Sequence, residues 1–517
     1  MVERALRAEL GELRALNAEL RLSCELYIEQ VAALRELERA SVELERKWVE
    51  LERVSGERDR LQEQEIALLR ARVAELEARL GQNPRNSSRP PSSEGYEKPA
   101  PRSRRERSDR GSGGQPGREG KTLRQVERPD EVVRHAPASC EDCGASLAEA
   151  PVTSTETRQV FDLPQVVLRV VEHQIEHRLC GCGQVSMATA PAGVGAPAQY
   201  GPGVRALGTY LLGAHHLPLA RTSELLGEVV GAPVSEGSLA GWYTAAADGL
   251  DGFDDALKSA LAGADVLGVD ETGARVDGGL AWIHAARTDA LTRYTVSTRR
   301  GTVAMDEAGV LPALSPDTVL VSDFWSPYWK YDVVHAVCGA HLGRELVAAA
   351  EVAGQAGWAE PLDQLLREIN RATTGARDAG ADELAPSLLA TYRRRYDDLV
   401  TAGWEANPDH HAGRRGQTRR PKHVNLLDRL DTHRDEVLRY AHDLRVPYTN
   451  NGSEQDIRPL KIRLKIAGCL RTTTGAEAFC RLRSYLSTAR KNNQSAYQAL
   501  RMLHDGNPWT PAQLEPG

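Results

Sequence analysis

Three acidic residues lie in three different local contexts along this 517-residue chain, and together they restrict its possible folds sharply. Asp270 and Asp323 each end a short run of β-forming residues, VLGVD and VLVSD. Glu454 follows TNNGS and opens a segment that is helical in pattern and strongly basic. A fold that uses all three must bring two strand ends and one helix start to the same place.

The order of predicted elements between residues 264 and 340 favours one such fold. The successive runs are DVLGVDETG, LAWIHAARTD, TRYTVSTRR, a helical GTVAMDEAGVL, DTVLVSDF and VVHAVCGAH. A three-strand meander, a helix and a further strand is the order expected of a ribonuclease H-like α/β domain, in which the first and fourth strands are neighbours. Asp270 and Asp323 should then lie side by side, and Glu454 should arrive from a later helix.

Carboxylates in this arrangement suit a site for two Mg²⁺ or Mn²⁺ ions. Two hard cations about 4 Å apart activate the attacking oxygen at a phosphodiester and stabilise the leaving oxygen. They need several carboxylate oxygens and one open face for the scissile phosphate. We expect Asp270 to bridge both ions, with Asp323 and Glu454 each holding one side. For any one Asp at a strand end, a turn or cap role is the simpler alternative.

The segment around Glu454 also carries groups suited to DNA. The net charge of the chain is -7, but Gln455–Asn493 contains 9 Lys/Arg against 2 Asp/Glu. Local basic patches, and not the global balance, decide whether phosphate binds. Basic residues alternate with apolar ones in this segment. Such side chains can bind the DNA phosphates and hold the duplex in place without recognising its base sequence. The residues that alternate in this way are Lys461, Arg463 and Lys465; the predicted DNA-binding set also includes Asn450, Asn451 and Arg458, on the resemblance described below.

The first 81 residues contain no proline and predict one long helix. Its apolar residues recur at alternating spacings of four and three, with Glu and Arg between them. This pattern is typical of a coiled coil and indicates self-association. A single amphipathic helix folded back on the body is the alternative, favoured by Gly11 and Gly56. The first run of this pattern is Leu6, Leu10, Leu13, Asn17 and Leu20.

Four of the eight cysteines cluster in one short region. Cys140 and Cys143 are two residues apart, and Cys180 and Cys182 follow after the strand-like run QVVLRVVEHQIEHRL. Two thiolate pairs joined by a hairpin can converge on a structural Zn²⁺ ion. The second pair is one residue short of the usual spacing, and His177 is near enough in sequence to replace a cysteine. An apo module with reduced cysteines is the alternative.

Residues 198–260 predict a helical region that resembles a helix-turn-helix. LARTSELLGEVVG is followed by a short turn at 232–234 and then by SEGSLAGWYTAAA, with Ser235 as the cap of the second helix. Plain helix packing is an equally good interpretation.

The 130 residues between Asp323 and Glu454 exceed what the bare fold needs. Residues 350–445 are mostly helical in pattern and predict an inserted subdomain. Its basic segment GRRGQTRRPKH, residues 413–423, is a candidate DNA-contacting loop, and a solvated loop is the alternative.

Composition sets the remaining bounds. The hydrophobic fraction is 41%, and no apolar run approaches a membrane span. The N-terminus lacks an apolar h-region, so we expect a cytoplasmic protein that associates with the nucleoid when bound to DNA.

The fold class expected is multidomain α+β. The predicted segments are a coiled coil (1–81), a disordered basic linker (82–129), a Cys-rich zinc module (130–197), a helix-turn-helix-like region (198–260), the first part of the catalytic core (261–349), the helical insertion (350–445), the Glu-bearing basic helix of the core (446–505) and a tail (506–517).

Over nearly its whole length the sequence resembles the DDE transposases of the insertion-sequence-66 family, found in bacterial mobile elements. The matching blocks are NPRNSSRPPSSEG, GVDETGARVDGGLAWIHAARTD, SDFWSPYWKY, VCGAHLGRELVAAAE and TNNGSEQDIRPLKIRLKIAGCLRTTTGAEAFCRLRSYLSTARKN. The resemblance implies that Asp270, Asp323 and Glu454 are the catalytic acids. It also implies that Asn450 and Asn451 match the Asn pair before the glutamate, that Arg458 matches the arginine after it, and that accessory proteins of the same element assist.

The predicted function is therefore a transposase that binds the ends of an insertion element, cleaves DNA and joins the 3′-hydroxyl ends to target DNA. A ribonuclease H-like metal-dependent nuclease without strand transfer is one alternative. A non-catalytic DNA-binding protein is another, disfavoured by the three intact acids. Expected partners are terminal-repeat DNA, target DNA and a second copy of the chain through the coiled coil.

Overall fold

The computed structural model describes residues 2–80, 123–163, 166–408 and 420–514. The predicted linker 82–129 and the loop 413–423 fall mostly outside this range. The chain divides into two compact units, one formed by the N-terminal segment and the other by the rest. Within the described residues, no helix is long and apolar enough to cross a lipid bilayer.

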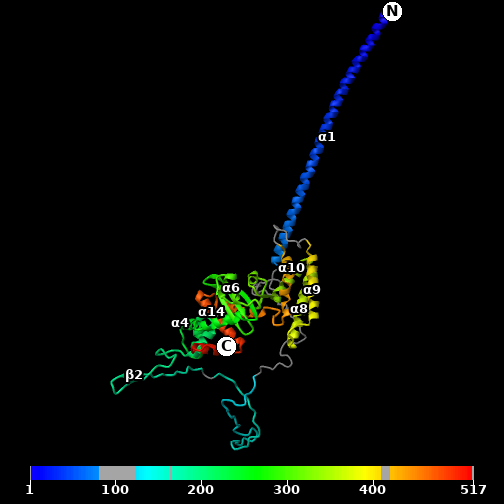
Figure 1. The fold of residues 1–517 in the computed structure, drawn as a ribbon. Helices are drawn as coiled ribbons and strands as arrows, with labels where there is room; N and C mark the ends of the chain where they lie inside the picture. Colours follow the sequence, from blue (N-terminus) through cyan, green and yellow to red (C-terminus); the bar gives the residue numbers. More distant parts are fainter. Residues whose placement is uncertain (1, 81–122, 164–165, 409–419, 515–517) are drawn as a thin grey trace. The chain divides into compact units, whose positions relative to one another are not determined.

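The N-terminal unit is one helix, α1 (Val2–Leu80), of 79 residues (Figure 1). Leu, Ala, Glu and Arg dominate it, and these residues favour helix strongly. The predicted long helix is therefore confirmed. Its described side chains are exposed along the whole length, the apolar ones included, among them Leu13 at 62% and Trp48 at 66%.

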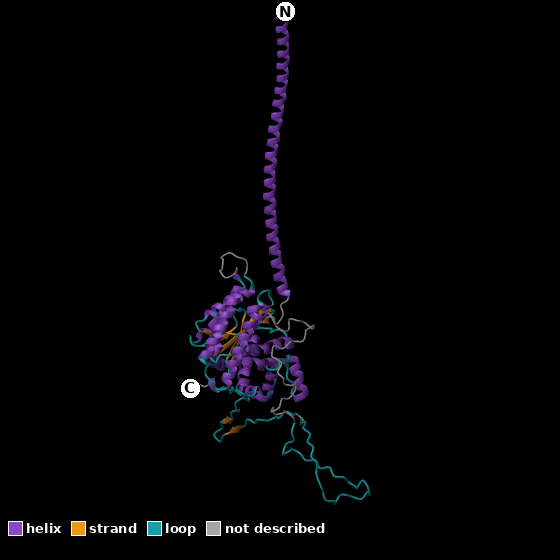
Figure 2. Cartoon of the chain, turned by 90° about the vertical axis from the view of Figure 1, so that its right-hand side faces the viewer, coloured by secondary structure: helices purple, strands orange, loops and turns teal. Residues whose placement is uncertain are grey.

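The second unit contains a five-stranded sheet in the order β5-β4-β3-β6-β7. In Figure 2 the strands lie inside a shell of helices. The first three form an antiparallel meander, while β3 pairs with β6 and β6 with β7 in parallel. The strands are β3 (Val266–Val276), β4 (Gly279–Arg287), β5 (Thr292–Ser297), β6 (Val319–Ser322) and β7 (Val334–Val337).

The chain turns from β3 into β4 through Asp277 and Gly278. Both have positive φ, 50° and 70°, as a two-residue hairpin turn of this twist requires. The β3–β6 connection instead passes through a helix, α6 (Thr302–Ala308), and a short 3₁₀ turn, η2 (Leu311–Ala313). The predicted meander, helix and neighbouring first and fourth strands are all present.

Helix α14 (Thr473–Lys491) covers the outer edge of β5. The backbone N–H of Thr292 donates to the Thr488 hydroxyl at 3.2 Å, and that of Tyr294 donates to the Ser484 hydroxyl at 2.9 Å. An edge strand otherwise presents unpaired N–H groups to solvent or to another chain. The Ser and Thr residues of α14 therefore complete the sheet on this side.

The helices preceding the sheet pack with the C-terminal helices. Helix α15 (Ala496–His504) contacts α2, and α14 contacts α4. One buried cluster joins these helices to the sheet, with Leu257, Leu267 and Tyr485 at its centre. The preceding helices are α2 (Pro202–Gly213), α3 (Leu219–Val230), α4 (Glu236–Asp248) and α5 (Asp251–Ala262).

A second helical group has its own core, built on Trp358, Tyr396 and Leu427, which continues into β6 and β7. Helix α7 (Gly339–Ala350) connects β7 to this group. The connection between β6 and β7 contains the 3₁₀ turn η3 (Ser326–Lys330), and η5 (Ala512–Leu514) lies near the C-terminus. The group comprises α8 (Ala356–Asp378), α9 (Pro386–Glu405), α10 (Lys422–Thr432), α11 (Arg434–Val437) and α12 (Arg439–His442).

Candidate active site

Asp270 and Asp323 come from neighbouring strands. The parallel register pairs Gly268 of β3 with Val321 of β6; Asp270 lies two residues further along β3, and Asp323 directly follows the last residue of β6. Paired strands run about 4.8 Å apart, and residues two apart on one strand face the same side. The two carboxylates are close enough for the charge on Asp323 to act on Asp270. The structure thus brings these two predicted acids together.

Glu454 lies in the first turn of α13 (Asn451–Ala467). The residue before the helix, Asn450, is 6% exposed, and its side-chain amide donates to the Val269 carbonyl at 2.6 Å. The Ser453 hydroxyl donates to the Asn450 side-chain oxygen at 2.6 Å. The start of α13 is therefore attached to β3 at the residue next to Asp270, which brings Glu454 to the two aspartates.

Close contact between α13 and β3 depends on a residue without a side chain. A Cβ atom added to Gly268 would lie 2.8 Å from both the Asn450 side-chain oxygen and the Ser453 hydroxyl. Real Cβ atoms do not approach polar atoms so closely, so any larger residue would push the helix away from the strand. Gly268 is thus required by packing, two residues before Asp270.

The pKa of Asp270 is raised to about 7, chiefly by burial and then by the neighbouring carboxylates of Glu271, Asp323 and Glu454. Like charges gathered in a partly buried place disfavour one another's ionisation. A divalent cation would supply the opposite charge, and Asp and Glu oxygens are the donors that Mg²⁺ prefers. The chemistry of this acid cluster therefore fits a divalent metal.

Each of the three acids accepts a hydrogen bond from the protein. The donors are the Glu271 amide for Asp270 at 2.9 Å, the Trp325 amide for Asp323 at 3.0 Å and the Arg344 guanidinium for Glu454 at 2.9 Å. In this arrangement, no group of three or more His, Cys, Asp or Glu side chains in the described ranges is gathered tightly enough to hold a metal ion. Each acid can keep its donor and still offer an oxygen to a cation, so metal binding would require the acids to move closer together.

Glu271, next to Asp270, is occupied by other partners. Its side chain is 3% exposed, forms an ion pair with Arg300 at 2.7 Å and accepts a hydrogen bond from the Tyr328 hydroxyl. Burial raises the pKa of Glu271, and both partners oppose that effect. The Arg300 guanidinium lies over the rings of Trp282 and Trp325, at 4.6 and 4.2 Å from their centroids. These contacts fix the side chain of Glu271 and so help to fix β3 next to Asp270.

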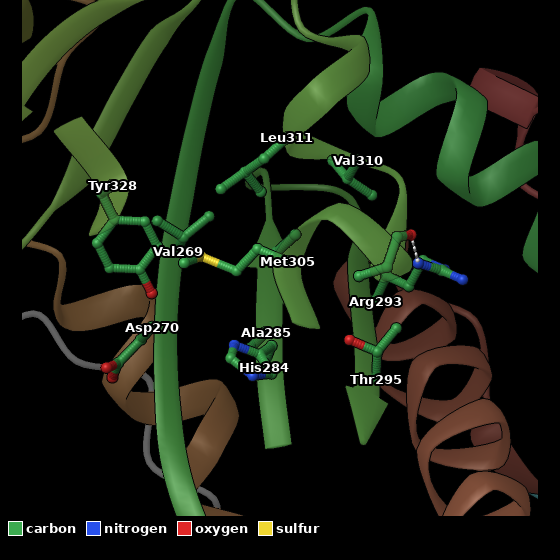
Figure 3. Close-up of a pocket in the computed structure, with 12 residues that line it drawn as sticks. Val269, Asp270, His284, Ala285, Arg293, Thr295, Met305, Val310, Leu311 and Tyr328 are labelled. Atoms are coloured by element: carbon green, nitrogen blue, oxygen red, sulfur yellow. Dashed lines mark hydrogen bonds between the residues drawn. The ribbon is translucent and has the colours of Figure 1, made fainter. Parts of the chain in front are cut away.

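A small cavity lies beside β3, lined by Val269, His284, Met305 and Leu311 among others (Figure 3). Its volume of about 20 Å³ is enough for one water molecule and too small for a nucleotide. In Figure 3 the carboxylate of Asp270 points away from His284 and Met305. The cavity is therefore a packing void behind the acids and is not the substrate site.

His341, in the first turn of α7, lies beside Glu454, with 3.9 Å between its Nε2 and the carboxylate. Burial lowers the pKa of His341, and Arg344 lowers it further. The chain before α13 packs against the start of α7 because Gly339 lacks a side chain: a Cβ there would lie 2.2 Å from the Tyr448 ring. His341 therefore lies at the edge of the acid cluster.

The six predicted DNA-binding residues fall into two groups. Asn451, Arg458, Lys461 and Lys465 are exposed at or along α13. Asn450 is buried and bonded to β3, as described above. Arg463 is half-buried, with its guanidinium 5.2 Å from the Phe479 ring and a hydrogen bond to the Gly468 carbonyl at 3.3 Å. The position of Asn450 thus serves the fold and does not offer its amide to DNA.

The cysteines form two similar turns. The N–H of Gly144 donates to the Cys140 carbonyl, and that of Gly183 donates to the Cys180 carbonyl, both at 2.9 Å. A short hairpin, β1 (His177–Leu179) and β2 (Val185–Met187), frames the second turn. Amides and the partner thiol lower the pKa of Cys140 and of Cys180. Each pair is a half-site for a soft metal, although the described residues do not gather both pairs around one point.

The helical pair before the sheet agrees with the predicted turn. Helix α3 ends at Val230, and the Ser235 hydroxyl caps α4 by accepting from the Ser238 amide at 3.1 Å. Trp242 does not face outward but packs edge-on to Tyr200, with 5.6 Å between ring centroids. Helix α4 contains no Lys or Arg, so it offers no cationic phosphate contacts of its own.

Comparison with protein families adds three matches to this geometry. The model of the transposase IS66 family matches residues 197–478, which is more than half of the chain. The chain belongs to this family. The zinc-finger binding domain of transposase IS66 matches residues 137–183 and so includes all four clustered cysteines, while a family of unknown function matches residues 2–124. No curated protein sequence matches the chain.

Membership of the transposase IS66 family implies a DNA-associated protein that uses a divalent metal, and the zinc-finger match implies zinc at the cysteines. The structure also shows a residue of this transposase that sequence reasoning missed. Asp456 accepts hydrogen bonds from Lys491 at 2.8 Å and Thr292 at 3.0 Å and lies 3.5 Å from Arg287. It attaches α13 to β5 and α14. Its one sequence signal is an acid two residues after Glu454 in an otherwise basic segment.

Proposed function

We propose that the protein is a transposase that cleaves the ends of its element and joins the 3′-hydroxyl groups to target DNA, with Asp270, Asp323 and Glu454 as the catalytic acids. The observation that carries this proposal is the meeting of these acids from β3, β6 and α13. The sheet order β5-β4-β3-β6-β7, antiparallel then parallel, supports a ribonuclease H-like core. Asp323 and Glu454 would hold one metal ion each, and Asp270 would bridge both.

The chain's own residues supply the positioning. When bound, divalent ions would lower the pKa of the attacking water or 3′-hydroxyl and neutralise charge on the leaving oxygen. Asn450 and Ser453 keep Glu454 at the aspartates. Arg344 and His341 flank Glu454 and would stand next to a bound phosphate. The exposed side chains of Arg458, Lys461 and Lys465 would contact the DNA backbone without reading its sequence.

A nuclease that hydrolyses without joining would use the same acids, so the joined product decides between the two. On oligonucleotides that carry the element's terminal repeats, we expect strand transfer that requires Mg²⁺ or Mn²⁺. Asp270→Asn should lower the rate by about 10³-fold or more, because it removes a metal-bridging carboxylate. Asp277→Asn, in the exposed turn at the end of the same strand, is the matched control and should leave the rate unchanged.

Two outcomes would contradict this function. Activity that survives Asp270→Asn would exclude the mechanism. Cleavage without a joined product would establish the nuclease, and DNA binding without cleavage in any metal would establish the non-catalytic alternative.

Two further proposals concern assembly. We infer that the four clustered cysteines bind one structural Zn²⁺ ion, because each pair is already turned into a half-site and zinc would supply the missing link between them. We also infer that α1 forms a coiled coil with a second copy of the chain, because its leucines are exposed along 79 residues. Zinc content of the purified protein and sedimentation of the isolated full chain test these points.

A further inference from the structure

A group of cationic side chains gathers where the turn after α2 meets α14. His216, in that turn, is 4% exposed, has a positive φ of 63° and leaves its Nδ1 without a hydrogen-bond partner. Its ring lies 6.1 Å from that of Phe479 on α14, and Arg463 of α13 lies over the same ring. The turn after α2, helix α13 and helix α14 therefore meet at this point.

The most deeply placed cation of the group is Arg483. It is 7% exposed, and its Nε and Nη1 have no hydrogen-bond partner. Arg483 lies four residues after Phe479 and seven before Arg490, spacings that place all three on one face of α14. Arg490 is exposed, so this face runs from the interior to the surface.

The charges that face this point are positive. The pKa of His216 is lowered to about 4, chiefly by burial and then by the charges of Arg483, Arg463, His215 and Arg490. The charged groups with the largest effects on this pKa are therefore all cationic. Among the described residues, no ion pair includes Arg463, Arg483 or Arg490.

Two groups on other elements do act on Arg483. Burial lowers its pKa, while the Tyr294 hydroxyl and, more weakly, Asp456 oppose this effect. Asp456 is already bonded to Lys491 and Thr292. A buried guanidinium without a carboxylate partner costs several kcal/mol. Its charge is therefore uncompensated in the protein alone, which is the state expected of a group that binds an anion.

The position of the group favours DNA as the source of that anion. Arg463 and Glu454 lie on the same helix, nine residues apart, which corresponds to about 14 Å along the axis. A duplex held at Glu454 carries phosphates at that distance on both strands. Helix α4 offers no basic residue, so any phosphate contact of this part of the molecule must come from other elements, such as α14.

We propose that Arg463, Arg483 and Arg490 bind the phosphate backbone of duplex DNA at the junction of α2, α13 and α14, as a second DNA contact apart from the acid site. This proposal rests on the proposed function, since it presumes that DNA lies at Glu454. The contact is independent of sequence, because guanidinium groups on phosphates carry no base information.

The test is DNA binding by the full chain at several salt concentrations, with a labelled random-sequence duplex and without added Mg²⁺ or Mn²⁺, so that cleavage does not occur. Arg483→Met and Arg490→Gln should each weaken binding about 3- to 10-fold and reduce the slope of log K against log salt by about 1. Arg481→Gln is the matched control: Arg481 lies on α14 as well but is paired with Asp251. It should leave both quantities unchanged.

A stability measurement separates binding from folding. If Arg483 serves DNA, Arg483→Met should keep or raise the melting temperature, since it removes an unpaired buried charge. A large fall in melting temperature for Arg483→Met, together with unchanged DNA binding by Arg490→Gln, would overturn the proposal. The proposal would also be overturned if Arg483→Met and Arg490→Gln gave the same slope of log K against log salt as Arg481→Gln.

Two further arms identify the ligand and isolate the proposed chemistry. If inorganic phosphate stabilises the wild type while Arg483→Met and Arg490→Gln leave DNA binding unaffected, the site binds a small anion. This result would overturn the DNA contact. Asp270→Asn should bind the duplex like the wild type. Loss of cleavage in that variant tests the catalytic proposal alone, and wild-type protein that does not bind DNA would defeat both.

Discussion

The two sides of the acid site are built in different ways. Asp270 and Asp323 are placed by the backbone, because the register of β3 and β6 puts the two acids at matching positions on neighbouring strands. Glu454 is separated from Asp323 by 130 residues, most of them in a helical group with its own core. It is placed by side chains, chiefly Asn450 and Asp456.

The difference shows where the site is vulnerable. A strand register is fixed by many backbone hydrogen bonds, and shifting it by one residue would turn every side chain to the other face. The start of α13 depends on a few hydrogen bonds and one glycine. Substitutions on the helix side should therefore disturb the site while the sheet remains intact, and the predictions below test this contrast.

The largest effect on stability is expected from Asp456→Asn. The change removes the carboxylate that pairs with Lys491 and Arg287, whose side chains are each 16% exposed. Leaving Lys491 without its carboxylate partner, and Arg287 with only the exposed Asp289, should lower the free energy of unfolding by about 2–4 kcal/mol. Chemical denaturation measures this quantity. Asp289→Asn, which removes a fully exposed partner of the same Arg287, should leave the unfolding midpoint unchanged.

Gly268→Ala should act next most strongly. Its Cβ would overlap the Asn450 side-chain oxygen and the Ser453 hydroxyl, so α13 must move away from β3, at an expected cost of about 1–3 kcal/mol. The metal-dependent rate should fall as well. On the same strand, a Cβ at Gly273 meets only Leu280 at an ordinary 3.5 Å, so Gly273→Ala should retain activity. Equal rates for the two variants would show that α13 is not held by this contact.

Asn450→Ala should lower the rate about 10- to 100-fold, the usual effect of removing a residue that orients a metal ligand. Asn451→Ala is the matched control, because Asn451 is adjacent and exposed. A larger effect on DNA affinity than on the rate, or an equal effect of both substitutions, would favour the DNA-contact role predicted from sequence.

The smallest effect is expected from Arg344→Gln. Arg344 competes with a cation for Glu454, so its removal should tighten Mn²⁺ binding about 3- to 10-fold, as judged from thermal stabilisation by the metal. Arg429→Gln breaks a neighbouring ion pair with Glu345 that does not involve the acids. Metal binding that weakens in Arg344→Gln would indicate that Arg344 orders Glu454 for the ion instead.

Local patterns in the sequence were sufficient for much of this arrangement. The alternation of β-forming residues gave the strands, the Asp277–Gly278 pair sits in the turn between two of them, and Ser235 caps α4 as expected. These features depend on residues close together in the chain. The same reasoning did not show that Asn450 is buried against β3 or that Arg463 lies over an aromatic ring, because each contact is made with a partner on another element, Val269 and Phe479.

By itself, the sequence determined the long α1 helix, the strand order and the family, because short-range periodicity and contiguous motifs encode them. Only the tertiary structure decided that Asp456 anchors α13, that Arg483 is buried with its Nε and Nη1 unbonded, and that Gly268 lets the helix approach the strand. The physical reason is that burial, charge compensation and close approach are properties of pairs of elements. Here those pairs are separated by up to about two hundred residues of chain.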